Sequence, residues 1–422
     1  MFRTSLVKKA AVMSIAAATL VALAGCSSPA ESTDQTLTFV TYTGGDAGQK
    51  YTDLIASFEE ANPGVTVDVE VLPGDDTYNS VVNSRLQGGT SPDIFEVLNS
   101  VPGLKPYVDA GLVTDLSDED WVEGQVDAVK DASTFFDGKT YASISQLDGA
   151  GVLYNVDLFE ANGVAVPTNW DEFQEAIAAF KAAGVIPLAT GAADGWPLGV
   201  QALSMAAELP DFSIDSSTAA GLADGSVKFS DSGWVNVVQD FESLVKNGSY
   251  DPNASGIAWP ASAEDFAAGK AAMLIQGTFA ISAVRAANPD LDMSMFVLPY
   301  VGAGETPVAS VSYGSILAIP TDAPNADLAK KFLDYLHQDD VLTTFLTTAS
   351  AFSPMVGVSG ELDPAAAAFA PAVEEKAAEY NLVSGLVPAT QAALVSGLQA
   401  IIAGSGTAAD AISALDRAQA DQ

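Results

Sequence analysis

Hydrophobic residues recur along the first hundred positions with two different spacings. Apolar and polar side chains alternate in residues 37–40 and 65–71, which predicts β-strands. Apolar residues in 51–58 instead fall at offsets of 0, 3, 4 and 7, which predicts one face of a helix. A second helical pattern over 78–86 and a strand pattern over 93–98 follow. Because strands and helices alternate, we expect a mostly parallel sheet.

The same alternation returns after residue 147. Strand patterns at 151–156 and 185–190 flank a helical pattern at 173–180, and a mainly helical stretch continues to about 287. The fold class is therefore α/β with two lobes, each a mostly parallel sheet flanked by helices. Ligands of such sheets bind beyond the carboxyl ends of the strands. The loops expected to face a cleft between the lobes are 43–48, 97–104 and 191–199.

The first 25 residues form a separate segment. Arg3, Lys8 and Lys9 give it a basic start, and residues 10–24 carry no charge, which is the pattern of a signal peptide. The uncharged run is shorter than the roughly 18 to 20 residues that a permanent transmembrane helix needs. We therefore expect residues 1–25 to be removed.

The only cysteine of the chain, Cys26, follows this segment directly. The sequence LAGC at 23–26 resembles the lipobox of bacterial lipoproteins, in which the cysteine becomes the acylated first residue of the mature chain. The alternative is a secreted protein with a free thiol, but a lone exported thiol invites mispairing. Residues 26–36 are too polar to pack and are predicted to be a flexible tether. Cys26 would then be a lipid anchor on the outer face of the cytoplasmic membrane.

Composition narrows the classes of partner. The chain carries 54 acidic against 17 basic side chains, with a net charge of −37 at pH 7. Nucleic acid is excluded as a partner, because phosphate binding needs clustered cations. A chain of 422 residues, 48% of them hydrophobic, is too long for one core and predicts two domains. We expect a monomer that is soluble apart from its lipid.

Several chemistries lack the residues they need. With one histidine and one cysteine, a histidine-based triad, a thiol enzyme or a zinc site is disfavoured. His337 ends a helical pattern whose apolar stripe begins at Leu328, and we expect it on a solvated flank. Asp251 and Asn253 match the start of a calcium loop, but its twelfth position is Ser262 instead of glutamate. We expect no cofactor and no metal. A hydrolytic pair of carboxylates stays open as an alternative.

Arginine is scarce. Outside the first segment the chain has only Arg85, Arg285 and Arg417, all in helical patterns. Carboxylates and phosphates are normally held by bidentate arginine, so an anionic ligand is disfavoured. A neutral, hydroxyl-rich ligand fits better, because planar polar side chains bind hydroxyl pairs and aromatic faces cover C–H patches.

The five tryptophans divide into two groups. Trp121, Trp170 and Trp234 lie in or beside helical patterns and are predicted to pack in cores. Trp196 and Trp259 belong to no periodic stripe and lie in segments rich in glycine and proline. They are the candidate stacking platforms, and the alternative is that each closes the end of a lobe.

Four segments, taken together and in order, resemble the extracellular solute-binding proteins of ABC importers, in the carbohydrate branch that includes maltodextrin-binding protein. The resemblance covers most of residues 37–346. The segments are FEEANPGVTVDVEV with RLQGGTSPDIFEV, then DGKTYASISQLDGAGVLYNVDLFEANGVAVPTNWDEF, then EDFAAGKAAMLIQGTFAI, and finally LPYVGAGETPVASVSYGSILAIPTDAPNADLAKKFLDYL.

The resemblance implies two lobes that enclose a sugar and are joined by three chain crossings. On this sequence the crossings are expected near 145–149, 296–300 and 351–355. Lobe 1 would consist of 37–146 plus 299–350, and lobe 2 of 147–298 plus 352–422.

The resemblance also implies ligand-binding residues. Those on the rim of the first lobe are Asp46, Glu96 and Asn99, and those at the first crossing are Gln146 and Asp148, with Tyr313 opposite them. Many relatives have a stacking tryptophan where this chain has Phe279, which stacks with less area and leaves more to Trp259. For the polar residues the alternative role is capping or loop hydrogen bonding.

The expected function is that of a lipid-anchored receptor that closes around a neutral mono- or oligosaccharide and delivers it to the permease subunits of an ABC transporter. The expected partners are therefore the sugar, the permease and, through the anchor, the membrane. Two alternatives remain open at this point: an exported glycoside hydrolase that uses a carboxylate pair, and an inert cell-wall lipoprotein.

Overall fold

The structure is a computed structural model that describes residues 35–73, 76–98, 101–134, 137–209, 212, 217–375, 377–380 and 384–421. The predicted signal peptide, Cys26 and the tether up to residue 34 lie outside the described residues. Strand β1 begins at Gln35, so the last two residues of the expected tether, 35 and 36, belong to the strand.

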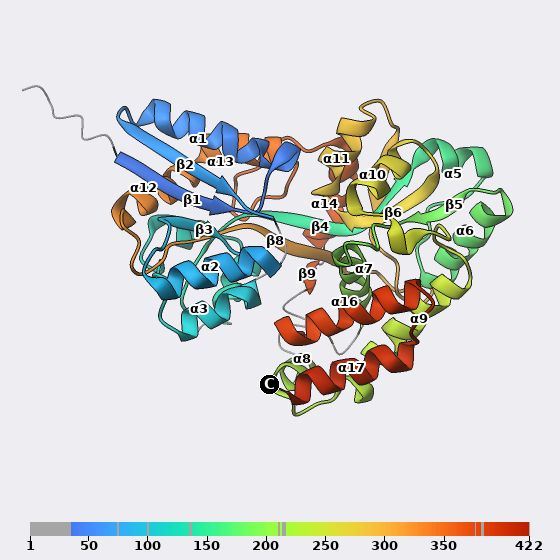
Figure 1. The fold of residues 1–422 in the computed structure, drawn as a ribbon. Coiled ribbons are helices and arrows are strands. Elements are labelled where there is room, and N and C mark those ends of the chain that lie inside the picture. The colour runs from blue at the N-terminus through green and yellow to red at the C-terminus, as the bar shows by residue number, and fades with distance from the viewer. Residues whose placement is uncertain are drawn as a thin grey trace, which may run out of the picture.

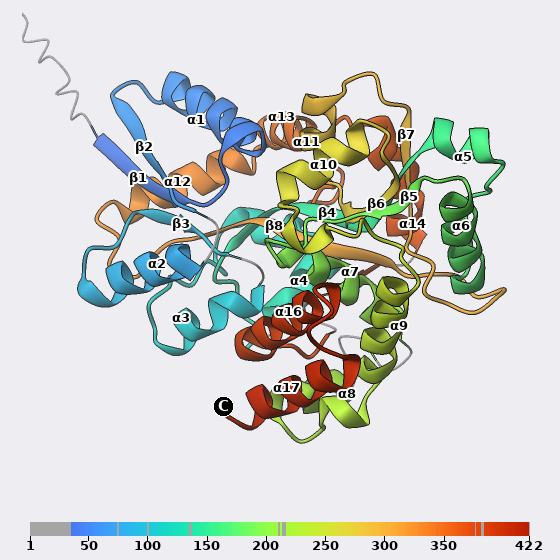
Figure 2. The same cartoon turned by 45° about the vertical axis from the view of Figure 1, so that its right-hand side comes forward.

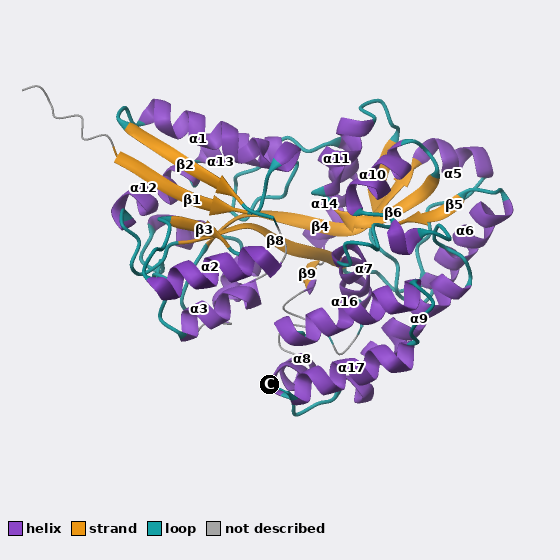
Figure 3. Cartoon of the chain, viewed as in Figure 1, coloured by secondary structure: helices purple, strands orange, loops and turns teal. Residues whose placement is uncertain are grey.

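The described strands form one sheet that runs through the whole molecule (Figure 3). Their order across the sheet is β2-β1-β3-β8-β4-β6-β5, with β7 paired to β4 and β9 paired to β8. The strands are β1 Gln35–Thr41, β2 Val65–Val71, β3 Ile94–Glu96, β4 Ser143–Asn155, β5 Ile186–Ala189, β6 Ala271–Gly277, β7 Met293–Phe296, β8 Ala309–Ala318 and β9 Ala377–Glu379.

The sheet is mixed, not mostly parallel as the sequence pattern predicts. The pairs β1–β2, β1–β3, β5–β6 and β8–β9 are parallel. Each antiparallel pair contains β4 or β8. These two long strands run against each other between the two masses of the molecule, and each therefore meets its neighbours in the opposite direction (Figure 1).

Strands β4 and β8 join the two lobes. The first half of β4 pairs with β8, from Ser143 opposite Leu317 to Ala150 opposite Ser310. The second half of β4 pairs with β6 and β7. The first expected crossing, near 145–149, therefore lies inside β4. The chain also passes between the two masses along β8. Near the second expected crossing, at 296–300, Leu298 and Tyr300 pack in the core of the second mass.

The first lobe is the mass built on β1, β2 and β3. Leu37 and Phe39 of β1 pack with Leu54 and Phe58 of α1 in one core, and helices α12 and α13 cover the same side. A second core lies on the other side, under α2 and α3. The helices are α1 Gln49–Ala61, α2 Asp76–Gly88, α3 Lys105–Asp109, α4 Asp127–Thr134, α12 Ala326–Leu336 and α13 Asp339–Ala349.

The second lobe is the mass built on β5, β6 and β7. Its larger core includes Phe173, Phe180 and the fully buried Trp234. Helices α16 and α17 pack together along one side of this lobe (Figure 2). The helices are α5 Val156–Asn162, α6 Trp170–Ala182, α7 Trp196–Ala206, α8 Ser217–Asp224, α9 Trp234–Lys246, α10 Trp259–Ala267, α11 Ala280–Ala287, α14 Pro364–Glu375, α16 Pro388–Ile402 and α17 Ala408–Ala420.

The two-lobed α/β class is confirmed, and the residue bounds of the lobes stay a prediction. The strands and helices expected over 37–98 and 151–190 are present. Among the described residues, no helix is both long and apolar enough to cross a bilayer.

One expected position is wrong. His337 is buried, not solvated: its ring stacks on Trp121, with 4.4 Å between the ring centroids, and its Nε2 lies 2.9 Å from the Ser143 hydroxyl. The reason is that the helix pattern says which flank His337 occupies but not that the 120–124 turn covers this flank. Burial lowers the pKa of His337 to about 3.

Candidate functional site

Glu96 lies at the carboxyl end of β3, beside the carboxyl end of β1. Its carboxylate accepts hydrogen bonds from the hydroxyls of Thr41, Thr43 and Tyr51, the last two at 3.1 and 2.8 Å. The side chain is 1% exposed. Burial, followed by the neighbouring Glu96 carboxylate, raises the pKa of Tyr51, so this hydroxyl stays a donor. Glu96 is therefore held as the acceptor of a buried network.

Gln146 and Asp148 lie two residues apart on β4, where the strand passes between the lobes. Their side chains share one face of the sheet, and the Gln146 Nε2 donates to the Asp148 Oδ2 at 2.7 Å. From the second lobe, the Thr278 hydroxyl donates to the Asp148 Oδ1 at 3.3 Å. From β8, the Ser315 hydroxyl donates to the Gln146 Oε1 at 3.1 Å.

Lys50 completes this cluster from the first lobe. It lies in the first turn of α1, and its Nζ donates to the Gln146 Oε1 at 2.7 Å. Burial lowers the pKa of Lys50, and the carboxylates of Glu96 and Asp148 act against that change. Burial raises the pKa of Asp148, and Lys50 is the first of the groups that oppose it. We call Lys50, Gln146, Asp148, Thr278 and Ser315 the junction network.

The junction network needs the glycine that lies opposite it. Gly314 pairs with Gln146 across β4 and β8. A Cβ atom at this position would overlap the Asp148 carboxylate and the Gln146 side chain. The missing side chain at Gly314 therefore leaves the space that the side chains of Gln146 and Asp148 occupy.

Three aromatic rings gather at the carboxyl ends of β5 and β6 in the second lobe. The ring centroid of Trp196 lies 5.1 Å from that of Trp259 and 6.0 Å from that of Phe279, and the ring planes are tilted by 59° and 54°. Trp196 is 38% exposed, and the other two are half-buried. These three residues form the aromatic cluster. Because the rings are tilted against one another and are not stacked face to face, their faces are not used up by mutual contact.

The backbone around the aromatic cluster is held in place by loop contacts. The Trp259 amide donates to the Asp194 carboxylate at 2.6 Å, and the Ala193 amide donates to the Ile257 carbonyl at 3.0 Å. From α16, the Gln399 Nε2 donates to the carbonyls of Ala192 and Ala193 at 2.9 and 3.1 Å. Helix α16 thus fixes the loop that precedes Trp196.

Glycines bring the backbone close to the rings. Trp259 Cα and N would lie 2.5 and 2.7 Å from a Cβ atom at Gly191. The Phe279 ring folds over Gly277 and leaves no room for a Cβ atom there. Both tryptophans are the first residues of helices, α7 and α10, with proline second, where proline is favoured. That explains why neither belongs to a periodic stripe.

The remaining predicted residues are placed as follows. Asp46 belongs to the 3₁₀ helix Gly45–Gly48, which contacts α11 of the second lobe. Asn99 lies outside the described residues. Tyr313 pairs with Leu147 and packs with the first-lobe core. Leu147 alternates with Gln146 and Asp148 along β4, so its partner Tyr313 leaves the sheet on the face opposite to that of Gln146 and Asp148. The alternation along β8 is interrupted at Ser315, whose φ is 49°.

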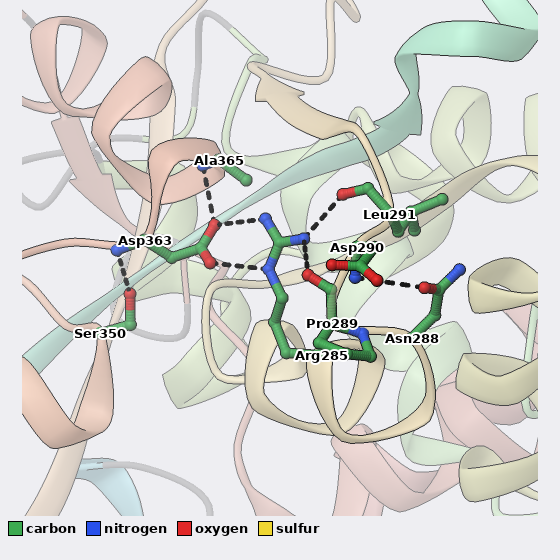
Figure 4. A network of polar contacts seen from close by, with 8 residues as sticks. All are labelled: Arg285, Asn288, Pro289, Asp290, Leu291, Ser350, Asp363 and Ala365. Atoms are coloured by element: carbon green, nitrogen blue, oxygen red, sulfur yellow. Dashed lines mark hydrogen bonds and ion pairs between the residues drawn. The ribbon is translucent and has the colours of Figure 1, made fainter.

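Of the three arginines that follow the first 25 residues, Arg85 and Arg285 are paired with carboxylates. Arg285 of α11 makes a bidentate pair with Asp363, at 2.8 and 3.1 Å, and donates to the carbonyls of Pro289 and Leu291 (Figure 4). Arg85 pairs with Glu70 on the surface of the first lobe, at 2.6 Å. Neither guanidinium belongs to the aromatic cluster or the junction network.

The candidate calcium loop forms a turn. The Asn253 amide donates to the Asp251 carboxylate at 2.7 Å, which closes the turn on itself. Within the described part of the chain, no three or more histidine, cysteine or acidic side chains come close enough to hold a metal ion.

Sequence reasoning missed Lys50, Asp194 and Gln399. One signal for Lys50 was present. It is a cation in the first turn of a helix, where the helix dipole favours anions, so a partner elsewhere in the fold could have been expected. The side chains of Asp194 and Gln399 form hydrogen bonds to backbone groups of loops, and no pattern of residue types predicts such contacts.

Two lobes joined by long crossing strands, with polar and aromatic groups at the carboxyl ends of the strands, define a two-lobed binding protein. The chain belongs to the bacterial extracellular solute-binding protein family, whose model matches residues 43–341.

Individual relatives are distant. A protein of Brucella abortus that is named as a binding protein is 24% identical over 321 residues, 75% of each chain. The multiple sugar-binding protein of Streptococcus mutans is 24% identical over 309 residues, 73% of this chain and 70% of the relative. The sugar transporter protein of Bacillus licheniformis in complex with stachyose superposes with a TM-score of 0.74 at 20% identity, and the match covers 90% of this chain and 98% of that one. At this identity the likeness of structures shows the fold alone.

Proposed function

We propose that this protein is an extracellular receptor that captures a neutral mono- or oligosaccharide between its lobes and delivers it to the permease of an ABC transporter. The observation that carries the proposal is the aromatic cluster. It offers tilted, partly exposed ring faces at the carboxyl ends of β5 and β6, beside α11, which the first lobe contacts through residues 45–48.

The charges of the site favour a neutral ligand. The junction network contains one cation, Lys50, and one anion, Asp148, and both are buried. Arg85 and Arg285 are paired with carboxylates elsewhere. Carboxylate and amide oxygens bind hydroxyl groups, and aromatic faces bind the C–H patches of a sugar ring. The stachyose complex and the multiple sugar-binding protein among the similar proteins agree with this ligand class.

A ligand stabilises a closed form only if it touches both lobes. The aromatic cluster belongs to the second lobe, whereas Glu96 and Lys50 belong to the first. A sugar that stacks on the rings and reaches the first-lobe rim would favour closure by the kind of hinge motion that two-lobed binding proteins use. We propose that Cys26 carries the lipid that keeps the receptor at the membrane.

The test is a thermal-shift screen of the mature protein with neutral mono- and oligosaccharides, sugar phosphates and sugar acids. A ligand that binds only the folded state raises the melting temperature. A shift with neutral sugars and contraction of the scattering profile in the same samples are expected. Tight capture of a phosphorylated or acidic compound, with no response to any neutral sugar, would overturn the proposal.

The glycosidase alternative has a separate test. The family consists of binding proteins, and we propose that this chain has no hydrolytic activity. Incubation with the oligosaccharides that bind, followed by chromatography, should return them intact. Release of monosaccharide that disappears in Asp148→Asn would favour the enzyme.

A further inference from the structure

We propose that Lys50 is a positioning residue that, through Gln146, fixes which hydrogen-bonding atoms Gln146 and Asp148 present to a ligand. This inference rests on the proposed function, because it concerns the same site. Neither the composition nor the family resemblance assigns Lys50 a role.

The first step is the orientation of the Gln146 amide. Its Oε1 accepts from the Lys50 Nζ at 2.7 Å and from the Ser315 hydroxyl at 3.1 Å. Both are donors, so the oxygen is placed toward them and the NH₂ group toward Asp148, to which it donates at 2.7 Å. A flipped amide would set its own N–H groups against the Lys50 ammonium. The charge of Lys50 therefore determines the amide orientation.

The second step is what remains for a ligand. An amide NH₂ group has two donors, and a carboxylate has about four acceptor positions. Gln146 uses one donor on Asp148, and Asp148 accepts from Gln146 and Thr278. Among the described residues, these bonds leave one N–H of Gln146 and further lone pairs of Asp148 for a ligand, side by side on one face of β4. A donor beside an acceptor matches two neighbouring hydroxyls of a sugar, of which one accepts and the other donates.

The third step is the charge of Asp148. Its side chain is 4% exposed, and burial raises its pKa, while Lys50 is the group that does most to lower it again. Glu96 and Tyr51 of the first lobe also face the two residues, and so do Tyr42 and Tyr380. Asp53 of α1, Tyr335 of α12 and Asp340 of α13 line the cavity beside Lys50. Burial raises the pKa of Tyr42, Tyr51 and Tyr380, so these hydroxyls remain neutral. Removing the charge of Lys50 should therefore raise the pKa of Asp148.

The Lys50 ammonium can be removed while the packing of its aliphatic chain, the stem, is kept. It forms one wall of a cavity of about 240 Å³ between α1 and α13, with Leu54 and Phe345. Lys50→Met keeps most of the stem and deletes the ammonium. Lys50→Arg keeps the charge. Lys330→Met is the matched control, because Lys330 also lies in the first lobe but pairs with Glu119 at 2.5 Å.

The experiment has a ligand-free arm and a sugar arm. Without ligand, the Asp148 carboxyl is titrated by ¹³C NMR in wild type, Lys50→Met and Lys330→Met. We expect the pKa of Asp148 to rise by about one unit in Lys50→Met and not in Lys330→Met, since a neighbouring charge shifts a pKa by one to three units. An unchanged titration in Lys50→Met would overturn the inference whether or not any sugar binds.

In the sugar arm, calorimetry follows affinity from about pH 4.5 to about pH 8. Lys50→Met should bind about tenfold more weakly at neutral pH, and its loss of affinity in acid should begin at a higher pH. Lys50→Arg should restore the pH profile. Weaker binding with the wild-type profile would mean that Lys50 only packs, and would overturn the inference. If wild type binds no sugar although the titration shifts, the proposed function fails and the Lys50–Gln146–Asp148 link stands.

Should Lys50→Met not fold, Ser315→Ala supplies the second test. It removes the other donor to the Gln146 Oε1 and leaves the charge in place. The inference expects a smaller loss of affinity and the wild-type pH profile. A shifted pH profile in Ser315→Ala would overturn it, because the charge of Lys50 would then not be the cause.

Discussion

The aromatic cluster and the junction network are two halves of one candidate site, built in opposite ways. The rings of Trp196, Trp259 and Phe279 are partly exposed, and their faces need no hydrogen-bond partners. Gln146 and Asp148 are buried, and donors from other elements already bind the Gln146 Oε1 and the Asp148 carboxylate. The second lobe thus presents apolar ring faces to a ligand, whereas the junction network presents polar atoms whose positions are fixed by hydrogen bonds.

The difference has a physical cause. An apolar ring can stay exposed at modest cost, but a buried polar group without partners costs roughly 1 to 3 kcal/mol. Polar groups at the junction must therefore be paired before any ligand arrives, and the fold must supply the partners. Substitutions in the polar half should act on stability as well as on binding, and those in the aromatic half mainly on binding.

The largest effect should come from Glu96→Ala. The change leaves the hydroxyls of Thr41, Thr43 and Tyr51 without their acceptor in a buried place. We expect the free energy of unfolding to fall by about 3 to 4 kcal/mol, as when one partner of a buried charged network is removed. Denaturant titration measures it. Glu70→Ala, which breaks an exposed pair with Arg85, is the control and should cost about 1 kcal/mol or less.

His337 extends the comparison to a buried polar group without a charged partner. Its pKa is lowered to about 3 in the folded protein, against roughly 6.5 when unfolded. Between about pH 6.5 and pH 3, His337 is protonated in the unfolded chain but not in the folded chain. The free energy of unfolding therefore falls as the pH drops toward 3. At pH 5 this amounts to about 2 kcal/mol.

In His337→Gln this loss should be absent. The difference in unfolding free energy between wild type and variant, measured at pH 7.5 and at pH 5, should change by about 2 kcal/mol in favour of the variant. The overall acid sensitivity of so acidic a chain is common to both proteins and cancels. A difference that is the same at both pH values would show that His337 is reached by protons in the folded state.

The two halves also differ in how well the sequence foretold them. Trp196 and Trp259 were proposed as ligand residues because they lie outside any periodic stripe, which the sequence itself shows. Gln146 and Asp148 were proposed only from the family resemblance. The ligand role of all four stays a prediction. Lys50 was not found, because its partner Gln146 is far away in the chain and only the crossing of β4 between the lobes brings them together.

The fold shows the same division. Local periodicity predicted β1, α1 and β2, because each depends on its own residues. The mixed pairing of β4 and β8 was missed, because strand direction depends on which neighbour a strand meets. The register of Tyr313 beside Leu147, and the burial of His337 under Trp121, are likewise set by segments that lie apart in sequence.

Binding effects of the aromatic half come next in size. Trp196→Ala and Trp259→Ala should each weaken sugar binding about tenfold or more, which corresponds to about 1.4 kcal/mol. The melting temperature of the free protein should change little in Trp196→Ala, whose ring is 38% exposed, and more in Trp259→Ala, whose ring is half-buried against a core of the second lobe. Trp234→Ala, which removes a fully buried ring, is the contrast and should lower the melting temperature clearly. Unchanged affinity in both Trp196→Ala and Trp259→Ala would show that a sugar does not stack on these rings.

The smallest effect expected is a gain. The family resemblance implies a stacking tryptophan at the place of Phe279, whose ring is half-buried beside Trp196. In Phe279→Trp the larger ring should add stacking area and tighten sugar binding a few-fold, at most about 1 kcal/mol. Phe279→Leu should weaken binding by a similar factor, because it keeps apolar volume but loses the flat face. Because the ring folds over Gly277, calorimetry should be run beside thermal unfolding. Weaker binding by Phe279→Trp with unchanged stability would mean that the ring serves to shape the cluster and leaves the stacking to the two tryptophans.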